Sequence, residues 1–155
     1  MFSLLFADCL RVNELCWDKN APNNTLQFND VTVDDKQLII QFRSYKHHTG
    51  KGPSIVVNPE VFLPLNPTSD FLAYLDLRGN HSGILMIDEK GDPVTRGWLV
   101  MILNRVLKAA AIQNNIKPHS FRIGCMNHLL KMGWSDIQIR RYGRWKSGAI
   151  YSYLR

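Results

Sequence analysis

Strand-like patterns in this sequence are confined to one stretch, residues 25–58. Three runs of apolar residues at 25–33, 37–43 and 54–58 are separated by turn-forming residues, with a longer loop between the second and the third. Outside this stretch, apolar residues recur mainly at steps of three and four, which is typical of helices. We therefore expect an α+β fold: a mainly helical domain with a small three-stranded antiparallel sheet.

The predicted helices have recognisable beginnings and ends. Residues 1–16 show a helical apolar pattern, and residues 66–70 offer N-caps to a helix over 71–77 that Gly79 ends. A long helix follows Thr95 and runs to about residue 114. Three more helices are expected: one from Pro118 that Gly133 ends, one capped by Ser135 that Gly143 ends, and a short one in the tail 148–155.

Length and composition favour one soluble globular domain. The 155 residues can bury a real core, and no apolar run approaches the ~20 residues that span a bilayer. The three cysteines form no Cys-x-x-Cys pair and have no zinc-ligand spacing, so we expect reduced, packing thiols in a reducing compartment and no metal.

Positive charge is concentrated in the C-terminal quarter. The formal net charge is +6 and the pI about 9.4, yet residues 117–155 alone carry eight lysines and arginines against one aspartate. A solvated basic helix face would account for this, and so would a surface that contacts phosphates. The distribution favours a polyanionic partner.

The first chemical candidate is the pair His119 and Arg122. Two residues three apart at a helix start lie on one face, beside backbone N–H groups that favour an anion. This pattern is common by chance, and in isolation an ordinary surface pair would be the preferred interpretation.

Three further segments change that interpretation. Arg11-Val12-Asn13-Glu14-Leu15 precedes the pair, and Gly143-Arg144-Trp145-Lys146-Ser147 and Tyr153-Leu154-Arg155 follow it. In this order and spacing, the four segments resemble the tyrosine recombinase (phage integrase) family over essentially the whole chain. The Gly-Arg-Trp-x-Ser form looks most like the Crypton-type recombinases of eukaryotic transposons.

The resemblance implies a set of site residues and a reaction. Arg11 and Arg122 match the family arginines and His119 the histidine between them. Tyr153 matches the nucleophile that forms a DNA 3′-phosphotyrosyl intermediate and leaves a free 5′-hydroxyl. The remaining matches are Glu14 as a supporting acid, Lys46 as the hairpin lysine, and Trp145 at the position that is histidine in many members. The family uses no metal or other cofactor.

These residue types suit the chemistry. Attack on a phosphodiester concentrates negative charge on the non-bridging oxygens, which two guanidiniums can clamp with forked donors. A phenol, whose pKa is ordinarily about 10, needs cationic surroundings and an acceptor for its proton, for which His119 is a candidate. A lysine on a loop can protonate the leaving 5′-oxygen.

Several assignments have competitors. Lys51 competes with Lys46, and Tyr151 with Tyr153, which is preferred because Tyr-Leu-Arg resembles the family's Tyr-Ile-Arg ending. Trp145 could belong to the core instead, and Arg11 and Glu14 could form only an i,i+3 ion pair worth ~0.2–0.5 kcal/mol. The residues expected to contact DNA outside the reaction centre are Lys51, Arg141, Arg144 and Lys146.

The leading hypothesis is a site-specific recombinase or transposase acting on double-stranded DNA, in which residues 1–155 are the catalytic domain. We expect this domain to be a fragment without the upstream DNA-clamping domain and the C-terminal tail of the family. The alternatives are a domesticated DNA-binding module without catalysis and an activity like that of type IB topoisomerases. The resemblance also implies possible dimers or tetramers on DNA, and a nuclear location if the chain derives from a eukaryotic transposon, or otherwise a cytoplasmic one with DNA. The absence of a long apolar run predicts no membrane partner.

Overall fold

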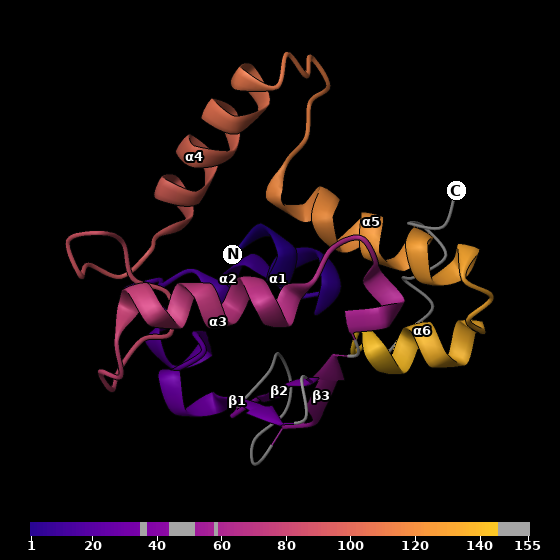
Figure 1. The fold of residues 1–155 in the computed structure, drawn as a ribbon, viewed down its shortest axis with the longest axis horizontal. Helices are drawn as coiled ribbons and strands as arrows, with labels where there is room; N and C mark the ends of the chain where they lie inside the picture. Colours follow the sequence, from indigo (N-terminus) through magenta and orange to yellow (C-terminus); the bar gives the residue numbers. More distant parts are fainter. Residues whose placement is uncertain (35–36, 44–51, 58, 146–155) are drawn as a thin grey trace.

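The computed structural model describes residues 1–34, 37–43, 52–57 and 59–145. One small sheet lies at the edge of a mainly helical fold, with the chain's first helix near the centre (Figure 1). Along the chain the elements are α1 (Phe2–Ala7), α2 (Val12–Leu15), the 3-10 turns η1 (Pro22–Asn24) and η2 (Phe28–Asp30), β1 (Val31–Asp34), β2 (Gln37–Gln41), β3 (Ser54–Val57), the 3-10 turn η3 (Pro59–Phe62), α3 (Pro67–Arg78), α4 (Arg96–Ala109), α5 (Pro118–Lys131) and α6 (Asp136–Tyr142).

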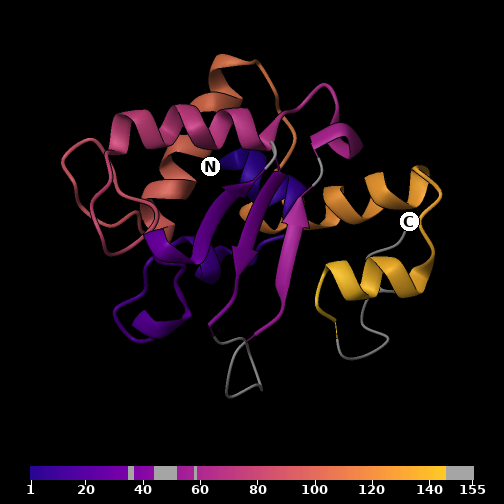
Figure 2. The ribbon, with the colours of Figure 1, turned by 60° about the horizontal axis from the view of Figure 1, so that its bottom comes forward.

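The sheet is antiparallel with the order β1-β2-β3, as predicted. Ile40 on the central strand β2 is paired with Val31 on one side and with Ile55 on the other. Alternate residues of β2 and β3 are buried, which is the pattern of a sheet with one face on the core. Figure 2 shows the three strands side by side, with the α5–α6 pair beyond the β3 edge.

The core is centred on α1, which packs closely against α5. Gly124 of α5 allows this approach, because a Cβ atom there would stand 3.1 Å from the Phe6 ring. Phe2 stacks on Phe121 with ring centroids 5.3 Å apart. The side chains of Leu4, Leu5, Leu129 and Ile139 are essentially without solvent contact, and they join the buried face of the sheet in one cluster. This packing holds the starts of α2 and α5 near each other.

Two predicted elements in the first 34 residues differ from the structure. The helix expected over residues 1–16 is broken into α1 and α2, because Cys9 adopts the left-handed conformation (φ 49°) and Arg11 is extended. The strand expected over 25–33 begins only at Val31, because the Asp30 carboxylate accepts a hydrogen bond from the Gln27 N–H (2.8 Å) and forms a turn before it.

The later helices agree with their predicted caps. Asn66 and Thr95 each accept a hydrogen bond from a backbone N–H at the start of α3 and α4, and Gly79 (φ 73°) ends α3. The helix that follows Thr95 ends at Ala109, before the predicted residue 114. The predicted tail helix 148–155 lies outside the described residues. None of the described helices has the length and apolar character that a membrane span requires.

Candidate active site

The break between α1 and α2 places Arg11 at the start of α2. Its backbone N–H donates to Glu14 Oε2 (2.7 Å) and its Nη1 donates to Glu14 Oε1 (3.0 Å). The carboxylate is almost fully buried, whereas the Arg11 side chain is one-third exposed. The i,i+3 pair considered from the sequence is therefore present, and it holds the Arg11 guanidinium at the surface next to a cavity.

Arg122 lies one turn into α5 and is only 3% exposed. Its Nη1 donates to the Cys9 carbonyl and its Nη2 to the Gly143 carbonyl. The left-handed backbone of Cys9 thus turns a carbonyl toward an arginine from a distant segment. These two bonds fix the plane of the guanidinium.

Trp145 covers the other side of Arg122. The Cζ atom of Arg122 lies 3.9 Å from the centroid of the Trp145 ring, a cation–π arrangement. The indole also folds over Gly143, where a Cβ atom would lie 1.3 Å from a ring carbon. Glycine at 143 is therefore required by this close approach, and Trp145 belongs to the site as well as packing against the core.

One cavity of about 420 Å³ brings these groups together. Its lining includes four of the residues predicted from the sequence: Arg11, His119, Arg122 and Trp145. They come from the start of α2, the start of α5 and the turn after α6. The cavity could hold a phosphoryl group with guanidiniums on two sides and the backbone N–H groups of the α5 start nearby.

Burial and like charge shape the electrostatics of this cavity. Burial, together with smaller contributions from the neighbouring Arg11 and Arg144 cations, lowers the pKa of Arg122 to about 10. Arg122 still remains a cation at neutral pH. Burial, followed by the charge of Arg122, lowers the pKa of His119, which favours the neutral imidazole that can accept a proton. Excess positive charge with few acids is what an anion site requires.

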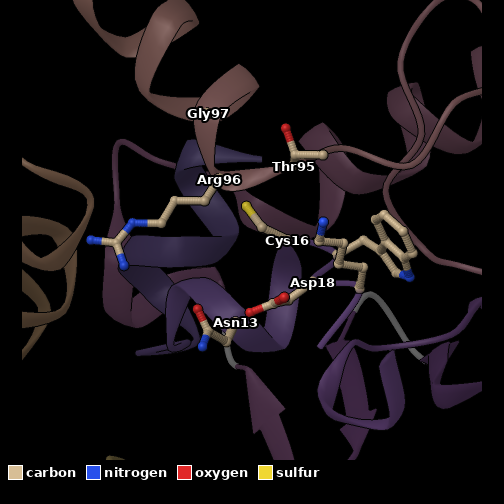
Figure 3. Close-up of a pocket in the computed structure, with 8 residues that line it drawn as sticks. Asn13, Cys16, Asp18, Thr95, Arg96 and Gly97 are labelled. Atoms are coloured by element: carbon tan, nitrogen blue, oxygen red, sulfur yellow. The ribbon is translucent and has the colours of Figure 1, made fainter. Parts of the chain in front are cut away.

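Arg96 is a lining residue that the sequence reasoning missed. It begins α4 and borders both this cavity and an adjoining one of about 390 Å³, which also contains Cys16 and Asp18. Figure 3 shows the Arg96 side chain extending away from Cys16 and Thr95. The available signal was the Thr95-Arg96 pair, a helix cap followed directly by a cation.

Arg144 lies elsewhere than predicted. Its side chain is only 2% exposed and donates to Glu14 Oε2 (2.6 Å), with its Cζ 4.0 Å from the Phe42 ring centroid. This burial contradicts the expectation that Arg144 contacts DNA directly. Arg141, from the same predicted set, is exposed on α6.

Lys46, Lys51, Lys146, Tyr151 and Tyr153 lie outside the described residues, so their roles stay predictions. Within the described ranges no cluster of three or more histidine, cysteine or acidic side chains is arranged to hold a metal ion.

Comparison with known proteins places this geometry in a family. The model of the phage integrase family matches residues 1–153. A tyrosine recombinase XerC of Staphylococcus epidermidis is 29% identical over 140 residues, which cover 86% of this chain and 40% of that protein. The chain therefore spans about 40% of the length of this curated relative.

Solved structures show the same fold. XerA recombinase has a TM-score of 0.75 at 22% identity, over 97% of this chain and 49% of that one. XerH bound to its difH substrate has a TM-score of 0.70 at 15% identity, over 99% and 41%. The Tn1549 transposon integrase in complex with circular intermediate DNA has a TM-score of 0.69 at 16% identity, over 99% and 52%. The arginine-lined cavity thus lies in the catalytic-domain fold of tyrosine recombinases, and the chain belongs to the phage integrase family.

Proposed function

We propose that this chain is the catalytic domain of a site-specific DNA recombinase or transposase that cleaves and rejoins strands through Tyr153. The observation that carries the proposal is the convergence of Arg11, His119, Arg122 and Trp145 on one cavity. Relatives with this fold are solved as complexes with DNA, including XerH in a pre-cleavage complex. A cavity lined by arginines suits one phosphodiester of such a substrate.

The proposed step conserves bond energy. The Tyr153 oxygen attacks the phosphorus, the bond from phosphorus to the 5′-oxygen breaks, and a 3′-phosphotyrosyl link forms. His119 accepts the phenolic proton, and Lys46 supplies a proton to the leaving 5′-oxygen. Attack by that 5′-hydroxyl reverses the step, so rejoining requires no nucleotide cofactor.

Each described residue has a role that its geometry supports. Arg11 and Arg122 approach the phosphoryl group from different elements and stabilise the charge on its non-bridging oxygens. Trp145 orients Arg122 through its ring and can donate its indole N–H to the phosphate. Glu14 holds Arg11 through two hydrogen bonds and takes no part in proton transfer.

The test is covalent trapping on nicked duplexes. A library with randomised sequence next to a nick lets the short strand leave after cleavage, so that the adduct accumulates. We expect a denaturant-resistant protein–DNA adduct from the wild-type chain, none from Tyr153→Phe, and an unchanged yield from Tyr151→Phe. Sequencing of the trapped strands would give the target site.

Other outcomes would point to the alternative functions. Salt-sensitive DNA binding without an adduct under any condition would indicate a non-catalytic DNA-binding module. Relaxation of supercoiled plasmid without sequence preference would indicate a topoisomerase-like activity. An adduct that forms with Tyr153→Phe and is lost with Tyr151→Phe would identify Tyr151 as the nucleophile instead.

We further propose a Crypton-type, eukaryotic transposon origin, a nuclear location, and assembly as dimers or tetramers on DNA. The support is the segment Gly143-Arg144-Trp145-Lys146-Ser147 and the family membership. Imaging of the tagged protein in its own cells and the mass of its complex with a trapped duplex would test these points.

A further inference from the structure

We propose that Arg144 is a positioning residue that aligns the two phosphate-binding arginines, Arg11 and Arg122. This inference rests on the proposed function and assigns a role to a residue that does not line the cavity itself. It also replaces the direct DNA contact that the sequence predicted for Arg144.

The Arg144 side chain acts on Arg11 through Glu14. Its Nη2 donates to Glu14 Oε2 at 2.6 Å, and the same oxygen accepts from the Arg11 backbone N–H at 2.7 Å. The other carboxylate oxygen accepts from Arg11 Nη1 at 3.0 Å. Arg144 thereby fixes the rotation of the carboxylate, and the carboxylate fixes the Arg11 guanidinium.

The backbone of the same turn acts on both arginines. The Arg144 carbonyl accepts from Arg11 Nη2 (3.3 Å), and the preceding Gly143 carbonyl accepts from Arg122 Nη2. Trp145, the next residue, stacks on Arg122. Between them, the three consecutive residues 143–145 therefore contact both Arg11 and Arg122.

This turn has a strained conformation that the Arg144 side chain can hold. The φ of Arg144, 57°, is in the left-handed region, which is unfavourable for a residue other than glycine. The ion pair with Glu14 and the stacking on Phe42 anchor the side chain on two sides. A glycine would relax the backbone but would lose both anchors.

Burial of a third guanidinium beside two others is unfavourable for stability. Burial lowers the pKa of Arg144; the Glu14 carboxylate opposes this shift, and the nearby Arg11 cation adds to it. Within the described part of the chain, no group accepts a hydrogen bond from its Nε or Nη1. An apolar side chain would fill this space with less desolvation. The arginine is therefore better explained by what it aligns than by packing.

The experiment compares Arg144→Met, Arg144→Lys and Arg144→Gly with the wild-type chain and with Arg105→Met, which removes one exposed arginine on α4. We expect Arg144→Met to slow single-turnover cleavage of a trapped target about 10- to 100-fold. Arg144→Lys should recover part of the rate because it keeps the charge. Arg144→Gly should stay slow although its backbone is relaxed, and Arg105→Met should cleave like the wild-type chain.

Two further measurements separate positioning from direct contact and from general damage. Removal of a residue that binds a phosphate reduces the slope of the logarithm of DNA affinity against the logarithm of salt concentration by about one. Arg144→Met should leave this slope unchanged. A methylphosphonate at the cleaved position is neutral and needs the arginine clamp less. The defect of Arg144→Met should therefore shrink to roughly threefold or less on that substrate.

A measurement without DNA keeps this inference distinct from the proposed function. In the free protein, Arg144→Met should move the Nε–Hε nuclear magnetic resonance signals of both Arg11 and Arg122, assigned by lysine substitution of each, whereas Arg105→Met should move neither. If the wild-type chain forms no adduct but these signals move, the recombinase proposal fails and the positioning role stands. Unmoved signals, a reduced salt slope, or full activity in Arg144→Gly would overturn the positioning role.

Discussion

Two regions of the molecule bury arginines in opposite ways. Arg78, at the end of α3, donates four hydrogen bonds to backbone carbonyls, those of Leu85 (3.0 Å), Gly79 (3.0 Å), His81 (2.6 Å) and Ile84 (2.9 Å). Its Cζ also lies 4.7 Å from the centroid of the Phe28 ring. This cation joins the loop after α3 to the end of the helix, and its described hydrogen-bond and ring contacts include no other arginine.

The electrostatics of the buried arginines in the candidate active site are less favourable than those of Arg78. Arg11, Arg122 and Arg144 approach one another around the buried Glu14 carboxylate. Two nitrogens of Arg144 and both oxygens of the buried Asp8 have no hydrogen-bond partner among the described residues. Burial by itself therefore does not identify a functional arginine. The distinguishing feature is an excess of positive charge that the protein's own acidic groups do not balance. An anionic ligand would balance it.

The largest expected effect is on the region around Arg78. Arg78→Met should lower the free energy of unfolding by about 4 kcal/mol, because the carbonyls of the 79–85 loop lose their buried donor. Denaturant unfolding followed by circular dichroism measures this change, with Arg105→Met as the control for an exposed arginine. A loss of unfolding free energy below about 1 kcal/mol would contradict the proposed difference between Arg78 and the arginines of the candidate site, since the loop would then not depend on this cation.

The same substitution at Arg122 should affect cleavage strongly and stability weakly. Arg122→Met should reduce the rate of covalent adduct formation about 10²- to 10³-fold, because one arm of the proposed phosphate clamp is lost. Its unfolding free energy should change much less than that of Arg78→Met, because relief from Arg11 and Arg144 offsets the lost bonds to Cys9 and Gly143. Paired cleavage and unfolding measurements test this, and equal stability losses in the two variants would contradict it.

The smallest expected effect concerns Asp8, which is fully buried and whose pKa is raised well above its usual value by that burial. The folded chain therefore keeps the Asp8 proton at pH values where the unfolded chain, with a pKa near 3.8, has lost it. Stability from this group is complete below that value and declines as pH rises. Asp8→Asn does not titrate, so it should be about 1–2 kcal/mol more stable than the wild-type chain at pH 7 and about equal near pH 4.

Unfolding of Asp8→Asn at a series of pH values would refine the comparison between the two regions. A variant that is less stable than the wild-type chain at pH 7 would mean that the Asp8 carboxylate is ionised and balanced by Arg144. The cationic surplus of the site would then be smaller than the described contacts indicate.

Local signals explain which elements could be predicted. The order and antiparallel pairing of the three strands, the cap residues Asn66, Thr95 and Ser135, and the glycine at the end of α3 agree with the structure, because each depends on neighbours in the sequence. The local sequence did not predict the break at Cys9, because a cysteine in a helical apolar pattern does not indicate a left-handed backbone. The turn at Asp30 was missed because it depends on one side chain bonding to the backbone.

The sequence by itself determined the segments, their order and the residue types of the candidate site, because periodicity, capping and motif spacing are properties of the chain. Only the tertiary structure decided which cations share a cavity. Arg11, Arg96 and Arg122 meet because α1 packs on α5 and orients the elements that follow, and Arg144 turns inward because Glu14 and Phe42 lie beneath its turn. The direction and burial of a side chain depend on contacts between distant segments, and no local pattern encodes them.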